Sequence, residues 1–425
     1  MKIFADLHIH SKHSRACSTS MDIEHIAKYS KIKGLNLVGT GDFTHPIWIK
    51  ELKEKLIDLG KGIFQDKIYN QNFVLQTEIS LVYTQNKKGR RVHLVVLAPS
   101  FEIVDKITNY LLKRGRIDYD GRPIFNISCR DFTKDILEIS NNIEIIPAHI
   151  WTPWFGLFGS KSGFDSVKEC FGDQADHIHS LETGLSADPE MFWRVSSLDK
   201  YTILSSSDCH SFWPWRIGRE ATIFEFDKIT YENLINAIRT KKGYIGTIEV
   251  DPAYGKYHFD GHRNCNISYS PEESKKHNKL CPVCGKPLII GVLARVEVLA
   301  DRLEKYKLTG AAEYKRLIPL IELLSFARKK GITSKNIQTE YFDTVSKFNN
   351  EFEILLNVSE KDLKLVFDEQ VVELILKNRI GKIEVVPGYD GVYGVIKPDN
   401  SNTINKKNIE NKKVFSKYQK QRTLE

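Results

Sequence analysis

The residues best suited to chemistry lie near the start of the chain, where a short apolar segment leads into Asp6-Leu7-His8-Ile9-His10. In an extended backbone, side chains two residues apart point to the same face, so His8 and His10 share a face with Asp6 behind them. Neutral imidazole is the commonest metal ligand in proteins. The pair therefore predicts half of a metal site, which needs further ligands from other segments.

Histidine and carboxylate side chains recur at the ends of later apolar segments. A lone histidine is more often a hydrogen-bonded core residue than a ligand, but recurrence at successive strand ends indicates a shared pocket. The residues in such positions are Asp42, His45, Glu78, His93, His149, His179, Glu182, Asp208 and His210.

Short apolar segments alternate with amphipathic ones over residues 1–250, which is typical of a parallel α/β arrangement, a barrel or near-barrel. Asn86-Lys87-Lys88-Gly89 is a turn signal, so we expect one hairpin within this pattern. The predicted strands are 35–40, 73–83, 92–98, 143–148, 177–183 and 202–206, and the predicted helices are 21–33, 47–59, 101–113, 131–140 and 229–240.

The ordered set of candidate ligands resembles the signature of the polymerase and histidinol phosphatase (PHP) superfamily. The resemblance covers residues 1–250 and implies a distorted (β/α)7 barrel with two or three divalent metals that hydrolyses phosphoesters. It assigns as metal ligands His8, His10, Asp42, His45, Glu78, His93, His149, Asp208 and His210. The match departs from the family where Phe43 follows Asp42 and where Ala16 occupies the position of an extra ligand. His13 is a weaker candidate, and His179 is expected to be structural.

Imidazoles and carboxylates mixed in one pocket suit Zn, Mn or Fe, and Mg is a further possibility for phosphoester chemistry. We expect Glu78 to bridge two metals about 3.5–4 Å apart and Asp208 to lie near the attacking water. The candidate catalytic residues are thus Asp208, Glu78 and His149.

Two loops that begin at candidate ligands carry four of the six tryptophans. Glycine-rich loops with large aromatic side chains suit stacking on bases, and nearby basic residues can contact phosphates. The candidate DNA-binding residues are Trp151, Trp154, Phe155, Phe158, Lys161, Trp213, Trp215 and Arg216. The alternative is that these aromatic side chains close the barrel mouth and pack on the helices.

Residues 251–291 change in character and contain Cys281-Pro-Val-Cys284-Gly-Lys-Pro, a strong zinc-knuckle signal. His262 and Cys265 are the most economical partners, which predicts one structural Zn bound by His262, Cys265, Cys281 and Cys284. His258 and His277 are alternatives for the histidine ligand.

Residues 292–398 have mostly helical patterns, including apolar stretches near 317–326 and 371–376, and we expect a helical DNA-binding domain there. Ser359 followed by Asp362 indicates a helix start, and residues 382–394 are typical of a strand with a glycine-rich turn. Residues 399–425 are rich in Lys and Asn and are expected to be a basic, flexible tail.

The PHP-like part, GTGDFTHP, PAHIWTPWF, CPVCGKPL, GVLARVEVLADR and PGYDGVYG occur in an order that resembles the endonuclease Q family up to residue 398. That resemblance implies a DNA repair endonuclease acting on damaged double- or single-stranded DNA. It implies cleavage 5′ of deaminated bases (uracil, hypoxanthine, xanthine) and of abasic sites. The tail lacks the Gln-led peptide ending in two aromatics that binds sliding clamps.

The chain has 425 residues, a net charge of +8 and seven cysteines, of which the last three cluster. This favours a cytoplasmic protein without disulfides, signal peptide or membrane segment.

Two other functions remain open. A small-molecule phosphatase of the histidinol phosphatase type leaves residues beyond 250 unexplained. A non-catalytic nucleic-acid-binding module leaves the near-complete ligand set unexplained.

Overall fold

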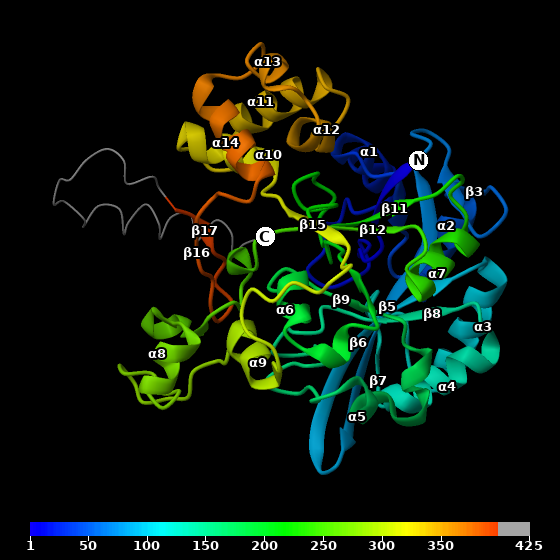
Figure 1. Ribbon diagram of the computed structural model, residues 1–425. Coiled ribbons are helices and arrows are strands. Elements are labelled where there is room, and N and C mark those ends of the chain that lie inside the picture. The colour runs from blue at the N-terminus through cyan, green and yellow to red at the C-terminus, as the bar shows by residue number, and fades with distance from the viewer. Residues whose placement is uncertain (398–425) are drawn as a thin grey trace.

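The structure, a computed structural model, describes residues 1–397. Its centre is a mixed sheet in the order β15-β12-β11-β1-β2-β5-β4-β3, in which β6 and β7 also pair with β5, and β8 pairs with β6 (Figure 1). Its strands are β1 (Lys2–Asp6), β2 (Leu37–Gly39), β3 (Leu56–Asp58), β4 (Phe64–Asp66), β5 (Asn72–Gln85), β6 (Lys88–Ala98), β7 (Ile124–Phe125), β8 (Glu144–Pro147), β11 (Ala221–Glu225), β12 (Tyr244–Glu249) and β15 (Glu313–Arg316).

The predicted strand positions in the first 250 residues are confirmed, and so is the hairpin. A second, parallel pair is formed by β9 (Ser180–Glu182) and β10 (Thr202–Leu204). β5 and β6 pair antiparallel out to Gln85 and Lys88. Asn86 and Lys87 between them have φ values of 53° and 61°, which suits the twist of a two-residue hairpin turn.

The sheet is less parallel than predicted. The pairs β1–β2 and β2–β5 are parallel, but β1–β11, β11–β12, β5–β6 and β6–β8 are antiparallel. The prediction failed here because an apolar segment between helices does not specify the direction in which the strand pairs. Within residues 1–397 no ladder joins β8 to β9 or β10 to β12, so a closed seven-stranded ring is not confirmed.

The helices of this part cover the sheet and begin at hydroxyl or carboxylate caps. The side chains of Asp22, Ser100, Ser128 and Thr230 accept the N–H three residues on, at the starts of α1, α3, α4 and α7. The predicted helix 47–59 ends early, because β3 begins at Leu56. The helices are α1 (Ile23–Lys33), α2 (Pro46–Lys55), α3 (Phe101–Leu112), α4 (Cys129–Ile139), α5 (Val167–Phe171), α6 (Pro189–Trp193) and α7 (Tyr231–Thr240), with 3-10 turns η1 (Gly172–His177) and η2 (Ser196–Leu198).

Residues 251–291 form a small module away from the sheet (Figure 1). Its elements are η3 (Pro252–Tyr254), β13 (Asp260–His262), η4 (Arg263–Cys265), β14 (Ile267–Tyr269) and α8 (Pro271–Lys276). β13 and β14 form an antiparallel hairpin, and a capping box of Ser270 and Glu273 starts α8.

The region from residue 292 onward is mostly helical, as predicted, with one difference. Its elements are α9 (Val292–Leu299), β15, α10 (Leu320–Arg328), α11 (Lys335–Ser346), α12 (Glu351–Leu356), α13 (Glu360–Leu363), α14 (Glu369–Arg379), β16 (Val385–Val386) and β17 (Val395–Ile396). β15 returns to the central sheet and pairs parallel with β12, so one strand of this region belongs to the sheet. Ser359 caps α13 at Asp362, and β16–β17 confirm the strand predicted near 382–394.

The helical part is joined to the sheet-containing part through the carboxylate of Glu351. Glu351 Oε1 accepts from Lys33 Nζ at 2.9 Å and from the Leu320 N–H at 3.1 Å, and its Oε2 accepts from the Tyr341 hydroxyl at 2.5 Å. These donors come from α1, α10 and α11, and the side chains of Lys33 and Glu351 are fully buried. The contact fixes α12 and its neighbours against α1 (Figure 1).

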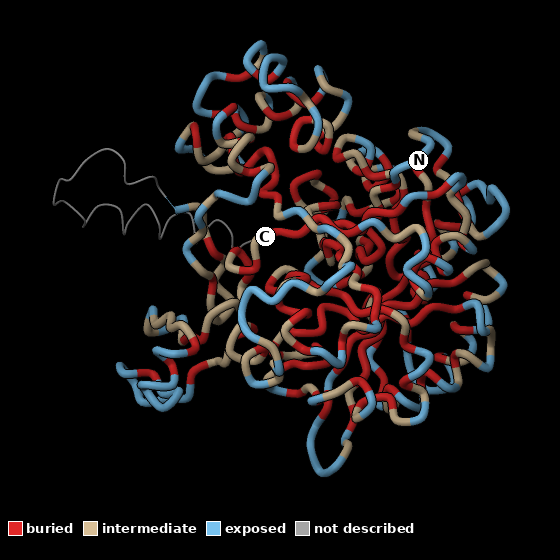
Figure 2. The backbone as a smooth tube through the Cα atoms, in the orientation of Figure 1, coloured by how far each residue is buried: buried red, intermediate tan, exposed pale blue. Residues whose placement is uncertain are grey.

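Buried residues are concentrated in the sheet and under its helices, whereas the 251–291 module is mostly half-buried or exposed (Figure 2). A module with so little core needs another source of stability. Within residues 1–397, no helix is long and apolar enough to cross a membrane.

Candidate metal centre

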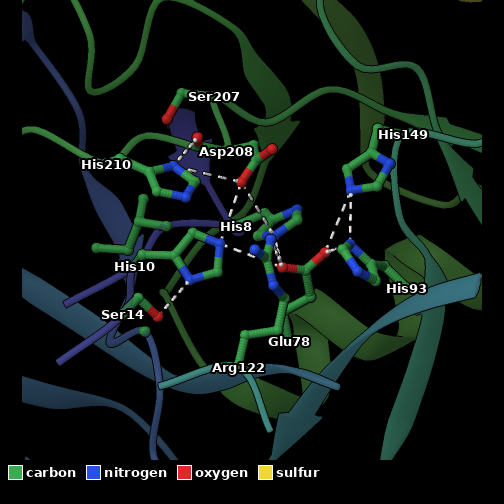
Figure 3. Close-up of polar contacts among 12 residues, drawn as sticks. His8, His10, Ser14, Glu78, His93, Arg122, His149, Ser207, Asp208 and His210 are labelled. Atoms are coloured by element: carbon green, nitrogen blue, oxygen red, sulfur yellow. Dashed lines mark hydrogen bonds and ion pairs between the residues drawn. The ribbon is translucent and has the colours of Figure 1, made fainter. Parts of the chain in front are cut away.

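The first group of candidate ligands joins three segments: His8 and His10 follow β1, Glu78 lies in the middle of β5, and Asp208 follows β10 (Figure 3). His10 Nε2 lies 3.2 Å from Glu78 Oε2 and 3.1 Å from Asp208 Oδ1, and His8 Nε2 lies 3.5 and 3.6 Å from the same two atoms. One ligand atom from each of the four residues lies within 4.8 Å of the others. This spacing suits one metal ion held by two imidazoles and two carboxylates.

The second group shares Glu78 with the first. Its other oxygen, Oε1, lies 2.7 Å from His93 Nδ1 and 3.2 Å from His149 Nε2. The two imidazole nitrogens are 3.3 Å apart. Glu78 therefore presents one carboxylate oxygen to each group, as a carboxylate that bridges two metals must.

The orientation of the histidines fits metal binding. His8 Nδ1 lies 3.0 Å from Glu182 Oε2, His10 Nδ1 lies 3.0 Å from Asp42 Oδ1, and His149 Nδ1 lies 3.0 Å from the Thr152 hydroxyl. His8 Nε2 is fully buried and has no hydrogen-bond partner within residues 1–397. A carboxylate on Nδ1 leaves the Nε2 lone pair free, which is how metal-bound histidines are normally held.

The charge state of the two carboxylates in the cluster also fits metal binding. Burial opposes ionisation of Glu78, but the neighbouring His93 and Arg122 outweigh it and hold the pKa of Glu78 well below its usual value. Burial likewise opposes ionisation of Asp208, and His8 and His10 outweigh it, so the pKa of Asp208 is also well below normal. Both carboxylates are thus ready to act as ligands.

Asp42, His149 and Asp208 share an unusual backbone conformation. Their φ values are 44°, 29° and 45°, a region that non-glycine residues seldom occupy. Such strain persists only where the surroundings enforce it, and it is concentrated at functional sites.

Three predicted ligands, Asp42, His45 and His210, lie outside the two groups. Asp42 is turned away from them, because Oδ2 accepts from the Ser11 backbone and hydroxyl and from Ser14, while Oδ1 faces His10 Nδ1. Asp42 therefore contacts a candidate ligand, His10, and its own role as a metal ligand stays a prediction. His45 stacks on His13 with ring centroids 4.3 Å apart.

His210 lies against the first group without joining it. Its ring centroid is 4.5 Å from that of His10, and its Nδ1 contacts the Asp208 carbonyl at 3.0 Å. His179 contacts Glu144 away from the cluster, in the structural role expected for it. Sequence reasoning gave no role to Glu182 as the partner of His8, and it missed Arg122 entirely, although Arg122 contacts Glu78 at 3.0 Å.

The aromatic loops contribute less free surface than predicted. Trp151, Phe158 and Trp215 are buried, so these three side chains pack in the core instead of facing DNA. Trp213 is half-buried and stacks on Trp215 at 4.8 Å, as the packing alternative foresaw. A stacking role fails at the buried positions because a base cannot reach them.

The rest of the predicted DNA-binding set is more accessible. Trp154 and Phe155 are half-buried and Lys161 is exposed. Phe155 lies over the His93 ring with centroids 4.3 Å apart, next to the second ligand group. Arg216 contacts Glu322 at 3.6 Å and so is engaged with α10.

The second candidate metal site lies in the 251–291 module. Ligand atoms of His262, Cys265, Cys281 and Cys284 all lie within 4.8 Å of one another, and Cys284 Sγ is 3.3 Å from His262 Nδ1. Burial opposes ionisation of the Cys281 thiol, but hydrogen bonds from Cys284, His262 and Val283 outweigh it and lower the pKa of this thiol to about 6. Of the alternatives, His277 stacks on the Tyr269 ring at 4.7 Å.

The fold and the linked ligand groups define the class of this protein, an α/β protein whose central sheet and the loops after its strands carry candidate sites for divalent metals. The crystal structure of the lesion-specific endonuclease PfuEndoQ from Pyrococcus furiosus matches it with a TM-score of 0.84 at 32% identity, over 95% of this chain and 98% of that one. The chain belongs to the endonuclease Q family.

Two further comparisons agree. Endonuclease Q in complex with a 27-mer duplex that carries an abasic lesion at the active site matches with a TM-score of 0.85 at 33% identity, over 96% of this chain and all of that one. The protein MJ0043 of Methanocaldococcus jannaschii is 35% identical over 68% of this chain, which spans only 36% of the length of MJ0043. The family model of the MJ0043 C-terminal domain matches residues 319–382, which contain α10 to α14.

Proposed function

We propose that this protein is a metal-dependent DNA repair endonuclease. The observation that carries the proposal is Glu78, whose two oxygens face two separate ligand groups in a member of the endonuclease Q family. A complex of a relative with duplex DNA that has an abasic lesion at the active site supports DNA as the substrate. A further part of the proposal is hydrolysis 5′ of uracil, hypoxanthine, xanthine and abasic sites, by a protein located in the cytoplasm.

Two or three divalent metals, when bound, would lower the pKa of a coordinated water and neutralise phosphate oxygens. The chain's own residues orient the candidate metal ligands. Glu182 and Asp42 hold the rings of His8 and His10 with Nε2 toward the centre. The side chain of Asp208 is 30% exposed, whereas those of His8 and His10 are fully buried, so a substrate reaches the cluster from the side of Asp208.

The first test is the Asp208→Ala variant. We expect it to keep its fold and to lose nicking activity by about 10³-fold or more, because the group that faces the substrate loses its carboxylate. The measurement is cleavage of an oligonucleotide with one uracil, with Mn, Mg or Zn, beside turnover of p-nitrophenyl phosphate. Asp176→Ala, at an exposed aspartate, is the control.

The substrates separate the possible functions. A single nick at a defined position beside uracil supports the proposal. Turnover of the small ester alone would favour a small-molecule phosphatase of the histidinol phosphatase type. Binding of DNA with neither product would favour a nucleic-acid-binding module.

The module at 251–291 would hold a structural zinc. Four protein ligands leave no open position for chemistry, and a metal stabilises a module that has little core. We expect the Cys284→Ser variant to lose about one equivalent of zinc and the circular dichroism signal of a folded module. His277→Ala is the matched control, and equal zinc loss in both variants would contradict the choice of His262 as the ligand.

DNA would be gripped by the half-buried and exposed residues of the first aromatic loop, Trp154, Phe155 and Lys161, together with the region 292–398. The Lys- and Asn-rich tail 399–425 lies outside the described residues, so its flexibility and the lack of a sliding-clamp contact stay predictions from sequence.

A further inference from the structure

Arg122 places a guanidinium beside the carboxylate that the two ligand groups share. Its Nη1 donates to Glu78 Oε2 at 3.0 Å, the same oxygen that lies 3.2 Å from His10 Nε2 and 3.5 Å from His8 Nε2. Figure 3 shows the arginine side chain reaching past Glu78 toward the middle of the cluster. A permanent positive charge therefore lies within the candidate metal centre.

The backbone that carries Arg122 is fixed in place. The Gly121 N–H donates to the His13 carbonyl at 3.0 Å, and the Arg122 N–H donates to Asp120 Oδ1 at 3.2 Å. A Cβ atom at Gly121 would lie 2.2 Å from Asp42 Oδ2, so only glycine lets this segment approach so closely. Two residues after Arg122 the chain enters β7, which pairs with β5. The backbone that carries the Arg122 side chain is therefore held in one position.

Most of the hydrogen-bonding capacity of Arg122 is unused. A guanidinium has five N–H donors, and within residues 1–397 Glu78 is the side chain's hydrogen-bond partner. The Arg122 side chain is 25% exposed, whereas that of Glu78 is fully buried. The remaining donors are therefore accessible to a molecule that enters the cluster from solvent.

We propose that Arg122 is a further catalytic residue, which binds the non-bridging oxygens of the scissile phosphate beside the metal centre. A guanidinium presents paired N–H groups that match phosphate geometry. In phosphoryl transfer, negative charge spreads over the non-bridging oxygens, and an arginine aimed at them stabilises the transition state. This role rests on the proposed function, because it assigns a residue within the same reaction.

A purely structural role has different consequences. If Arg122 only holds Glu78 in position, its removal should lower metal content, and phosphate binding would fall only as metal is lost. If Arg122 contacts phosphate directly, phosphate affinity should fall while metal content is unchanged.

The experiment compares zinc-loaded wild-type protein with Arg122→Gln, Arg122→Lys and the control Arg116→Gln, a change at an exposed arginine that pairs with Asp118 in the same loop. Metal content is measured first, then binding of inorganic phosphate by calorimetry, then nicking of DNA with one uracil. We expect Arg122→Gln to bind phosphate at least about 10-fold more weakly and to lower kcat by about 10²- to 10³-fold at full metal content. The phosphate affinity and kcat of Arg122→Lys should lie between those of wild type and Arg122→Gln, because lysine keeps the positive charge but lacks the paired N–H groups of a guanidinium.

Phosphate affinity that is equal in Arg122→Gln and wild type, or a wild type that does not bind phosphate, would overturn the role of Arg122. Loss of phosphate affinity only in step with loss of metal would overturn it as well. A wild type that binds phosphate through Arg122 but nicks no damaged DNA would contradict the proposed function and leave the phosphate contact supported.

Discussion

Replacing Glu78 with glutamine is expected to lower nicking activity by about 10⁴-fold or more, the largest effect of any single change in the metal centre. Glu78 is the one residue common to both ligand groups. Glutamine has one oxygen and no charge, so it cannot serve both groups. The variant should also bind less than half of the wild-type amount of metal, measured by elemental analysis of the purified protein.

Glu144→Gln is the matched control for this change. Glu144 is also a buried carboxylate that contacts a histidine, since its Oε1 lies 3.0 Å from His179 Nδ1, and it lies at the start of β8, away from the cluster. Glu144→Gln should alter stability while metal content and nicking stay near wild type. Full metal content in Glu78→Gln would contradict a bridging role for Glu78.

The second large effect is expected on stability, from replacing Glu351 with alanine. The change removes a carboxylate that accepts three hydrogen bonds and leaves Lys33 buried without its partner. Breaking a buried ion pair in this way costs about 3–5 kcal/mol. The free energy of unfolding should fall by this amount in urea titrations followed by tryptophan fluorescence.

A neighbouring glutamate on α12 tests whether the loss of stability comes from the buried contact of Glu351. Glu353 lies on the same helix and is half-buried, and its carboxylate accepts hydrogen bonds from the Asn357 side chain. Glu353→Ala should cost less than about 1 kcal/mol. A loss for Glu351→Ala as small as that for Glu353→Ala would show that the buried contact does not hold the helical part on α1.

The site could be predicted from sequence to the extent that its residues follow apolar segments. His8, His10, His149 and Asp208 follow strands, whereas Glu78 lies in the middle of β5, and the structure brings all five together. Convergence of strand ends accounts for His8, His10, His149 and Asp208. Glu78 and His93 lie within β5 and β6, and the pairing of these two strands brings them to the same place.

Supporting residues could not be predicted in the same way. Asp42 has the residue type and position of a ligand, but the N–H and hydroxyl groups of Ser11 and Ser14 occupy its oxygens. Arg122 lies in a loop before a two-residue strand, and no pattern in the sequence brings it next to Glu78. Hydrogen-bond competition and loop paths depend on tertiary contacts.

The fold was predictable in its elements and not in all of its pairings. Apolar segments gave the strand positions, but the direction of β11 and the return of β15 to the sheet depend on partners far away in sequence. The sequence left both exposure and burial of Trp151 and Trp215 open, because a glycine-rich loop with aromatic residues has the same composition whether it folds inward or outward.

The parallel pairing of β12 with β15 constrains how this protein can be shortened. The register runs from Gly246 opposite Glu313 to Glu249 opposite Arg316, so the chain leaves one end of the pair and must re-enter at the other. Parallel neighbours need a connection of about a dozen residues or more. Trimming the intervening 63 residues to a tight loop would therefore detach β15 from β12. A shortened version of the protein would still have to keep a connection long enough to run back along the paired strands.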